Sequence, residues 1–297
     1  MIASVSGAEN ACFFPFFRNW ADSLSKNLQF IFILCDIIIC HLKKKKGLCP
    51  LEDKQTSLIY RIIRWLVRLF YPKTKIVGAE KIPAEASVIV GNHTQMNGPI
   101  VGELYFPGKK YIWCAGEMLE WKDVHGYAFR DFWSQKPKWT HWFYKLLSYI
   151  ITPLAVCIFN NAHTIPVWHD ARLVSTFRTS MQRLQEGNHL IIFPEKDEHY
   201  NNIVYEFQDR FIDLARMYYR RTGTALRFVP MYIAPALKTA YLGEPITFDP
   251  TAKIDDERGR IASYLKEEIT RIAKSLPEHT VVPYRNIPKR QWPKNTD

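Results

Sequence analysis

Three short polar stretches follow apolar runs in this sequence, and each contains residues that can take part in proton transfer or anion binding. They are GNHTQMNGP (91–99), WHDAR (168–172) and PEKDEH (194–199). An imidazole such as that of His93 can act as a general base that removes a proton from an alcohol. Such a base is normally oriented by an acceptor on its second ring nitrogen, and no carboxylate follows His93 within reach along the chain.

The elements around these stretches predict an α/β fold. Short strands are expected at 75–83, 86–92, 163–168, 189–195 and 226–235, and amphipathic helices at 172–187, 206–223 and 255–276. Strands and helices that alternate with short links indicate right-handed crossovers and a largely parallel central sheet flanked by helices. Residues 111–157, which are rich in tryptophan, are expected to form helices that line or cover a groove.

The three polar stretches are expected to meet at one edge of this sheet. In open α/β sheets, ligands bind outside the carboxyl ends of the strands, where loops and helix N-termini present free backbone N–H groups. A single histidine at such a position is most often structural. Three polar strand ends in one sheet favour a binding or catalytic site.

The order and spacing of these blocks resemble the glycerolipid acyltransferase family of the lysophosphatidic acid type. The resemblance covers about residues 74–235: VGAEKIP and VIVGNH, then IPV, a helix, LIIFPE, and a strand that ends in VPMYIAP. It implies transfer of a fatty acyl group from a coenzyme A or carrier-protein thioester to an alcohol, with no further cofactor. In the family motif Asn-His-x-x-x-x-Asp the histidine is the general base, which implies that role for His93, preceded by Asn92.

The chain departs from the family pattern at charged positions. Gly98 stands at the motif aspartate, His169 at an arginine after the IPV strand, and Glu198 at the arginine of the Phe-Pro-Glu-Gly-Thr-Arg block. Asn97, four residues after His93, could orient the imidazole or merely cap a helix that begins near Pro99.

Other residues are candidates for the site. Asp197 or Glu198 could swing toward the imidazole in place of the missing aspartate. The candidate substrate-binding residues are Asn92, His169, Arg172, Glu195 and Lys196. Because the family arginines are exchanged, phosphate recognition is expected to be weakened or moved, and Arg172 and Lys196 are either phosphate ligands or solvated surface charges.

These residues lead to two alternatives for function. The first is a membrane-associated acyltransferase with His93 as base, acting in phospholipid synthesis on a glycerolipid or another alcohol. The second is a catalytically impaired member of the same fold that binds lipid or acyl chains. No metal site is expected: a hydrolase built on His163, His169, Asp170 and His199 has no ligand spacing in its favour. No nucleic-acid-binding motif accompanies the net charge of +11.

The first 73 residues are expected to form a helical segment that docks on a membrane. Residues 43–75 carry ten Lys or Arg against two acidic residues, the apolar run 28–42 precedes four lysines, and 57–73 forms a basic amphipathic helix. The run 28–42 either spans the bilayer, lies in its interface or is a buried helix. The six cysteines show no CxxC pair, which favours a reduced environment and the cytoplasmic face of the membrane. Residues 74–280 are expected to form the α/β domain, and 281–297 an irregular tail.

Overall fold

The structure is a computed structural model that describes residues 57–134 and 136–297. The expectations for the apolar run 28–42 and the lysines 43–46 lie outside these residues.

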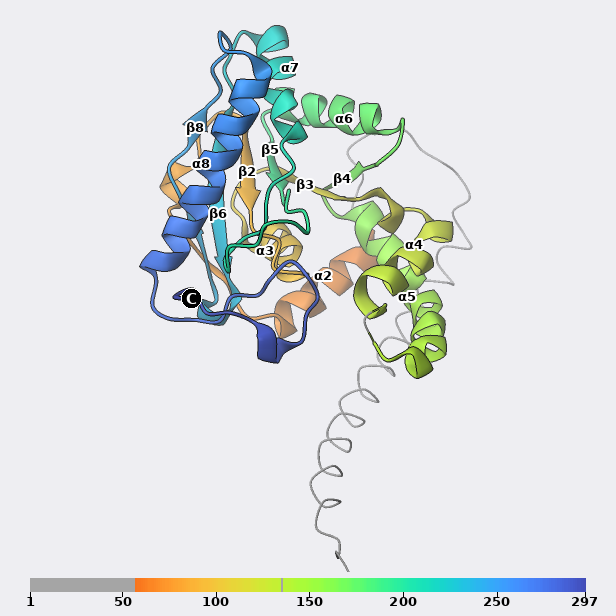
Figure 1. Ribbon diagram of the computed structural model, residues 1–297. Helices are drawn as coiled ribbons and strands as arrows, with labels where there is room; N and C mark the ends of the chain where they lie inside the picture. Colours follow the sequence, from red (N-terminus) through yellow and green to blue (C-terminus); the bar gives the residue numbers. More distant parts are fainter. Residues whose placement is uncertain (1–56, 135) are drawn as a thin grey trace, which may run out of the picture.

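A mixed, mostly parallel sheet forms the centre of the molecule (Figure 1). Its strands are β1 (Lys75–Val77), β2 (Ser87–Gly91), β3 (Lys110–Ala115), β4 (Thr164–Val167), β5 (His189–Ile192), β6 (Arg227–Ala234), β7 (Thr239–Leu242) and β8 (Ile246–Thr247). They follow the order β1-β7-β6-β2-β5-β3-β4, and β8 pairs with β6. Only the β6–β7 and β6–β8 pairs are antiparallel. The α/β fold class is therefore confirmed.

Helices cover both faces of the sheet. They are α2 (Leu58–Phe70), α3 (Asn97–Tyr105), α4 (Trp121–Ala128), α5 (His141–Asn161), α6 (Leu173–Gln185), α7 (Asp213–Thr222) and α8 (Ile254–Ser275). Buried side chains alternate along β2 because successive residues of a strand point to opposite faces. Val88 and Val90 join the core that includes residues of α6, α7 and α8, whereas Ile89 joins the core that includes Val101 of α3.

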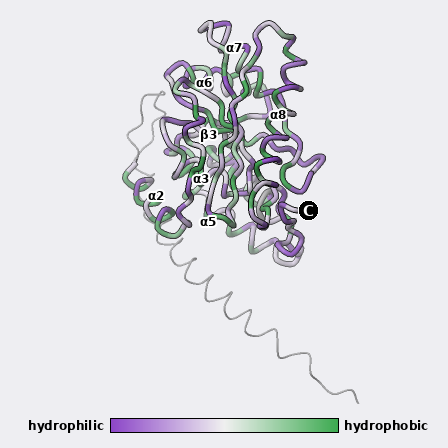
Figure 2. Tube along the Cα trace, turned by 90° about the vertical axis from the view of Figure 1, so that its left-hand side faces the viewer, coloured by the Kyte–Doolittle hydropathy of each residue, from purple (hydrophilic) through white to green (hydrophobic). Residues whose placement is uncertain are grey.

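Helices α2, α4 and α5 form a group beside the sheet, seen around the lower right of Figure 1. Ile59 and Ile63 of α2 pack with Cys157 of α5, and Val124 of α4 packs with Ala155 of α5. In Figure 2, α2 lies at the outer edge of the molecule, where hydrophobic and hydrophilic positions alternate along the tube. The predicted helix at 57–73 is thus confirmed in position.

Two local predictions are wrong. Residues 110–115 form β3, between β5 and β4, where helices were expected. Its KYIWCA sequence is short and only Ile112 is fully buried, so it lacks the continuous apolar run of β5. The helix expected from residue 206 begins at Asp213. Phe207 instead forms an isolated bridge with Glu195.

The tail after α8 folds back on itself without long regular elements. Thr280 forms an isolated bridge with Lys294, and the buried Asn295 side chain accepts from the backbone N–H of His279 and donates to the carbonyl of Ala273. These contacts hold the segment between them against the end of the domain. Figure 1 shows this dark-blue segment crossing below the sheet.

Candidate functional site

His93 lies two residues beyond β2, in a turn that leads into α3. Thr94 and Gln95 adopt φ values of 46° and 56°, a left-handed conformation that is uncommon for residues other than glycine. Two backbone hydrogen bonds close the turn: the N–H of Asn97 donates to the carbonyl of Thr94, and the N–H of Gly98 donates to the carbonyl of His93. Strained backbone of this kind is concentrated at functional sites.

The imidazole of His93 sits between two aromatic rings. Phe193 and Tyr284 each meet it edge-on, with ring centroids 5.4 Å away. Burial lowers the pKa of His93 to about 4, and the backbone of Gln95 offsets only part of that effect. The ring is therefore neutral at pH 7. Its Nδ1 atom is buried and has no hydrogen-bond partner among the described residues.

Asn97 does not orient this ring. Its Oδ1 accepts a hydrogen bond from the Tyr71 hydroxyl at 2.9 Å, and its Nδ2 donates to the carbonyl of Thr94 at 2.9 Å. Asn97 thus ties the turn to the segment after α2. The prediction that its amide holds the His93 imidazole is not supported by these contacts.

Asn92 and Glu195 hold the backbone around His93. The Asn92 side chain pairs with both backbone groups of Ile233 in β6, at 2.7 and 3.1 Å, and is buried. Glu195 accepts from the backbone N–H of His93 at 2.6 Å and from that of Tyr205 at 2.8 Å. These contacts fix the position of the His93 loop, and binding of substrate by the two residues stays a prediction.

Glu195 is expected to make stability depend on pH. Burial raises its pKa to about 7, against the effect of the two backbone donors. As the pH rises, the carboxyl of Glu195 loses its proton in the unfolded chain at a lower pH than in the folded protein. Its contribution to the free energy of unfolding therefore falls by about 1.4 kcal/mol per pH unit from about pH 4.5 to 7. Between pH 5.5 and 7.5, urea unfolding is expected to show a fall about 2 kcal/mol larger in the wild type than in Glu195→Gln. Equal falls in the two proteins would contradict this pKa.

The loop after β5 carries further charges, but none of them bonds to the imidazole. Lys196 is paired with Glu198 at 2.7 Å, on the surface. Asp197 lies 3.6 Å from the guanidinium of Arg285 in the tail. Neither Asp197 nor Glu198 forms a hydrogen bond with His93 in the part of the chain that the structure describes.

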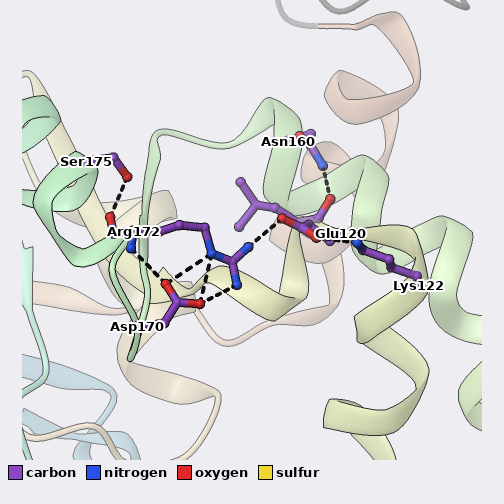
Figure 3. A network of polar contacts seen from close by, with 7 residues as sticks. Glu120, Lys122, Asn160, Asp170, Arg172 and Ser175 are labelled. Carbon is purple, nitrogen blue, oxygen red and sulfur yellow. Dashed lines mark hydrogen bonds and ion pairs between the residues drawn. The ribbon is translucent and has the colours of Figure 1, made fainter.

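His169 and Arg172 lie away from His93. The end of β4 is separated from β5 by β3, so its loop does not adjoin the other two. In Figure 3, Arg172 points toward Asp170 and Glu120. Its guanidinium also stacks 3.5 Å from the centre of the Trp168 ring, and His169 is exposed. Arg172 is thus held in a surface network rather than presented to a substrate at His93.

A cavity of about 540 Å³ adjoins His93, within the range of small-molecule sites. Its walls come from the 93–103 segment, β3, α4, α5 and the tail. Most of the lining is apolar, including Met96, Ile100, Ile112, Met118, Ile158 and Phe159. Glu103, Arg130 and Asp197 add polar groups. A neutral base at the wall of a largely apolar cavity suits a substrate that has both a long apolar part and a hydroxyl group.

Several residues that line the cavity carry no recognisable signal in the sequence. Tyr284, Arg285 and Asn286 come from the tail, which has no periodicity and no motif, and Cys114 comes from β3. Among residues 57–134 and 136–297, no group of three or more His, Cys, Asp or Glu side chains could hold a metal ion.

Comparisons with known proteins give little beyond this geometry. No family model matches the sequence, and no curated protein matches it. The chain is similar to the crystal structure of the 1-acyl-sn-glycerophosphate (LPA) acyltransferase PlsC from Thermotoga maritima, with a TM-score of 0.42 and 15% identity over 82% of this chain and 95% of that one. With a TM-score and identity this low, the function has to be argued from the site itself.

Proposed function

We propose that this protein is a membrane-associated acyltransferase that moves an acyl group from a coenzyme A or carrier-protein thioester to an alcohol, with His93 as general base. The observation that carries the proposal is the placement of a neutral imidazole on the wall of a largely apolar cavity. Because Nδ1 is buried, Nε2 is the nitrogen assigned to the substrate.

The reaction needs no covalent intermediate on the protein. Nε2 takes the proton from the acceptor hydroxyl while its oxygen attacks the thioester carbonyl. Collapse of the tetrahedral intermediate breaks the carbon–sulfur bond, and the thiolate leaves with the proton from the imidazolium. The first amides of α3 are not assigned to the oxyanion, because those of Asn97 and Gly98 already donate within the turn.

The acceptor in this proposal is a lipid alcohol that is not held by Arg172 or Lys196. Both side chains are paired on the surface outside the cavity lining. An acceptor panel of lysophosphatidic acid, glycerol phosphate and a neutral monoacylglycerol checks this part. A strong preference for lysophosphatidic acid that is lost in Arg172→Gln would overturn it.

Helix α2 supports the membrane part of the proposal. Its buried residues Ile59 and Ile63 pack on α5, and a second apolar row remains exposed to solvent. That row consists of Leu58, Ile62, Trp65 and Leu69. No acidic residue occurs from Ser57 to Ala79, as suits the headgroup region of an anionic bilayer.

The second candidate is a catalytically impaired member of this fold that binds an acyl chain or lipid. The unpartnered Nδ1 atom favours it, because no carboxylate bonds to the ring and only the backbone of Gln95 stabilises the imidazolium that forms during proton transfer. Transfer of a radiolabelled acyl group by the wild type and by His93→Ala separates the two. Transfer by the wild type that His93→Ala abolishes supports the enzyme, whereas acyl binding by both proteins with no transfer supports the second candidate.

A further inference from the structure

The N-terminal half of α5 and the turn before it carry a row of large apolar side chains that are mostly exposed, although the ring of Tyr149 also stacks on His125 of α4. Trp139, Trp142, Leu146 and Tyr149 are 77, 69, 54 and 59% exposed. Their spacings of three, four and three residues place them on one helical face. Isolated exposed apolar residues are ordinary, but a contiguous row of this kind marks an interaction surface.

The stretch of sequence that carries this row has only basic charges. Residues 134–169 contain no Asp or Glu, and Lys136, Lys138 and Lys145 are exposed beside the row. Tryptophan and tyrosine prefer the boundary between the headgroups and the acyl chains, and lysine side chains can extend from there to lipid phosphates. An acidic protein surface would satisfy the lysines but would not require an aromatic belt.

We infer that this row, Trp139–Trp142–Leu146–Tyr149, lies in the interface of an anionic lipid bilayer as a second docking element beside α2. The inference shares membrane association with the proposed function but does not depend on acyl transfer. Contact between α2 and α5 joins the two elements. It also places the membrane next to the helix whose far end, Ile158 and Phe159, lines the cavity of His93.

Length and packing indicate that α5 lies along the bilayer surface rather than across it. Lys138–Asn161 is long and apolar enough to span a membrane, with 28% of its most apolar window buried. The exposed row, however, covers only about 15 Å of helix, half of the roughly 30 Å hydrocarbon core. Beyond Tyr149 the helix packs on α2 and α4 through Ala155 and Cys157, and a span would have to break these contacts.

Quenching of tryptophan fluorescence by brominated lipids tests this inference in the full chain. The vesicles contain phosphatidylcholine and phosphatidylglycerol whose acyl chains carry bromine either near the headgroup or near the bilayer centre. The wild type is expected to be quenched mainly by the shallow bromines. The variant Trp139→Phe/Trp142→Phe is expected to lose a large part of this quenching, at least half of the shallow component.

A matched variant and a folding control complete the experiment. Trp292→Phe, in the tail, is expected to keep the wild-type quenching. The double variant is expected to keep the wild-type thermal midpoint because both side chains are largely exposed, and Trp292→Phe is expected to lose only the small contribution of the hydrogen bond from Trp292 to the carbonyl of Ile287. Equal quenching of the wild type and the double variant would overturn the inference, even if both proteins bind vesicles through another segment. Stronger quenching of Trp139 and Trp142 by the deep bromines would show that α5 spans the bilayer, and would overturn it too.

Discussion

Replacing His93 by alanine is expected to lower acyl transfer by about two to four orders of magnitude, the usual worth of a positioned general base. Alanine leaves the apolar cavity in place, so binding of the acyl donor should change little. The loss should therefore fall on kcat rather than on KM. His93→Gln, which keeps a polar side chain of similar length but cannot accept the proton, is expected to lose as much.

The pH dependence of the wild type gives a second test of the same residue. Because burial lowers the pKa of His93 to about 4, the ring stays neutral down to pH 5.5, and kcat/KM is expected to stay level between pH 7.5 and 5.5 with respect to this group. A base with the ordinary histidine pKa of about 6.5 would instead lose about tenfold over that range. His169→Ala, which changes an exposed histidine outside the cavity lining, serves as the control and should match the wild type. Glu195 also titrates in this range, so Glu195→Gln is a second control, and a tenfold fall that persists in this variant would show that the ring is more solvated than the structure has it.

The parallel sheet and the place of His93 follow from local features of the sequence. Apolar runs such as 189–192 are buried on both faces, and the polar turn after each run marks the edge of the sheet. Strands β2 and β5 are parallel neighbours in the sheet, so the loops that follow them lie at the same edge. Glu195, after β5, can therefore reach the backbone of His93, after β2. These relations need only periodicity and chain order.

The partners of single side chains do not follow in this way. The spacing of four residues allows Asn97 either to orient His93 or to cap a helix, but Tyr71, far away in the sequence, donates to its amide oxygen. The sequence leaves Arg172 as either a phosphate ligand or a solvated surface charge, and the structure pairs it with Glu120 from the segment before α4. Each partner comes from a segment whose position is fixed only by tertiary packing, as is also true of Tyr284. Sequence patterns therefore locate the loop of a site more readily than the bonds within it.

Replacing Gly98 by aspartate would restore the residue that the resembling acyltransferases have at this position, yet it is expected to disrupt the site rather than repair it. A Cβ atom on Gly98 would lie 2.5 Å from the carbonyl oxygen of His93 and 3.0 Å from the Phe193 ring. The first contact is with backbone, so the strained turn at 93–95 would have to move. Gly98 is therefore required by the local packing, and this turn has no room for the motif carboxylate as it stands.

Gly98→Ala is expected to lower the free energy of unfolding by about 1–3 kcal/mol, the usual effect of overpacking. Gly98→Asp adds the same Cβ together with a charge, so its cost should be at least as large. The aspartate adds the burial of a carboxylate with no cationic partner, so it should be the more harmful of the two. Urea unfolding measures both, and Gly259→Ala is the matched control. Gly259 is exposed in α8 with open space around its Cβ position, so alanine there should stabilise the protein by up to about 1 kcal/mol through helix propensity. A Gly98→Asp protein with wild-type stability and faster acyl transfer would contradict this prediction. It would show that the turn can adopt the arrangement of the family motif, and that the packing of Gly98 against His93 and Phe193 does not exclude the carboxylate.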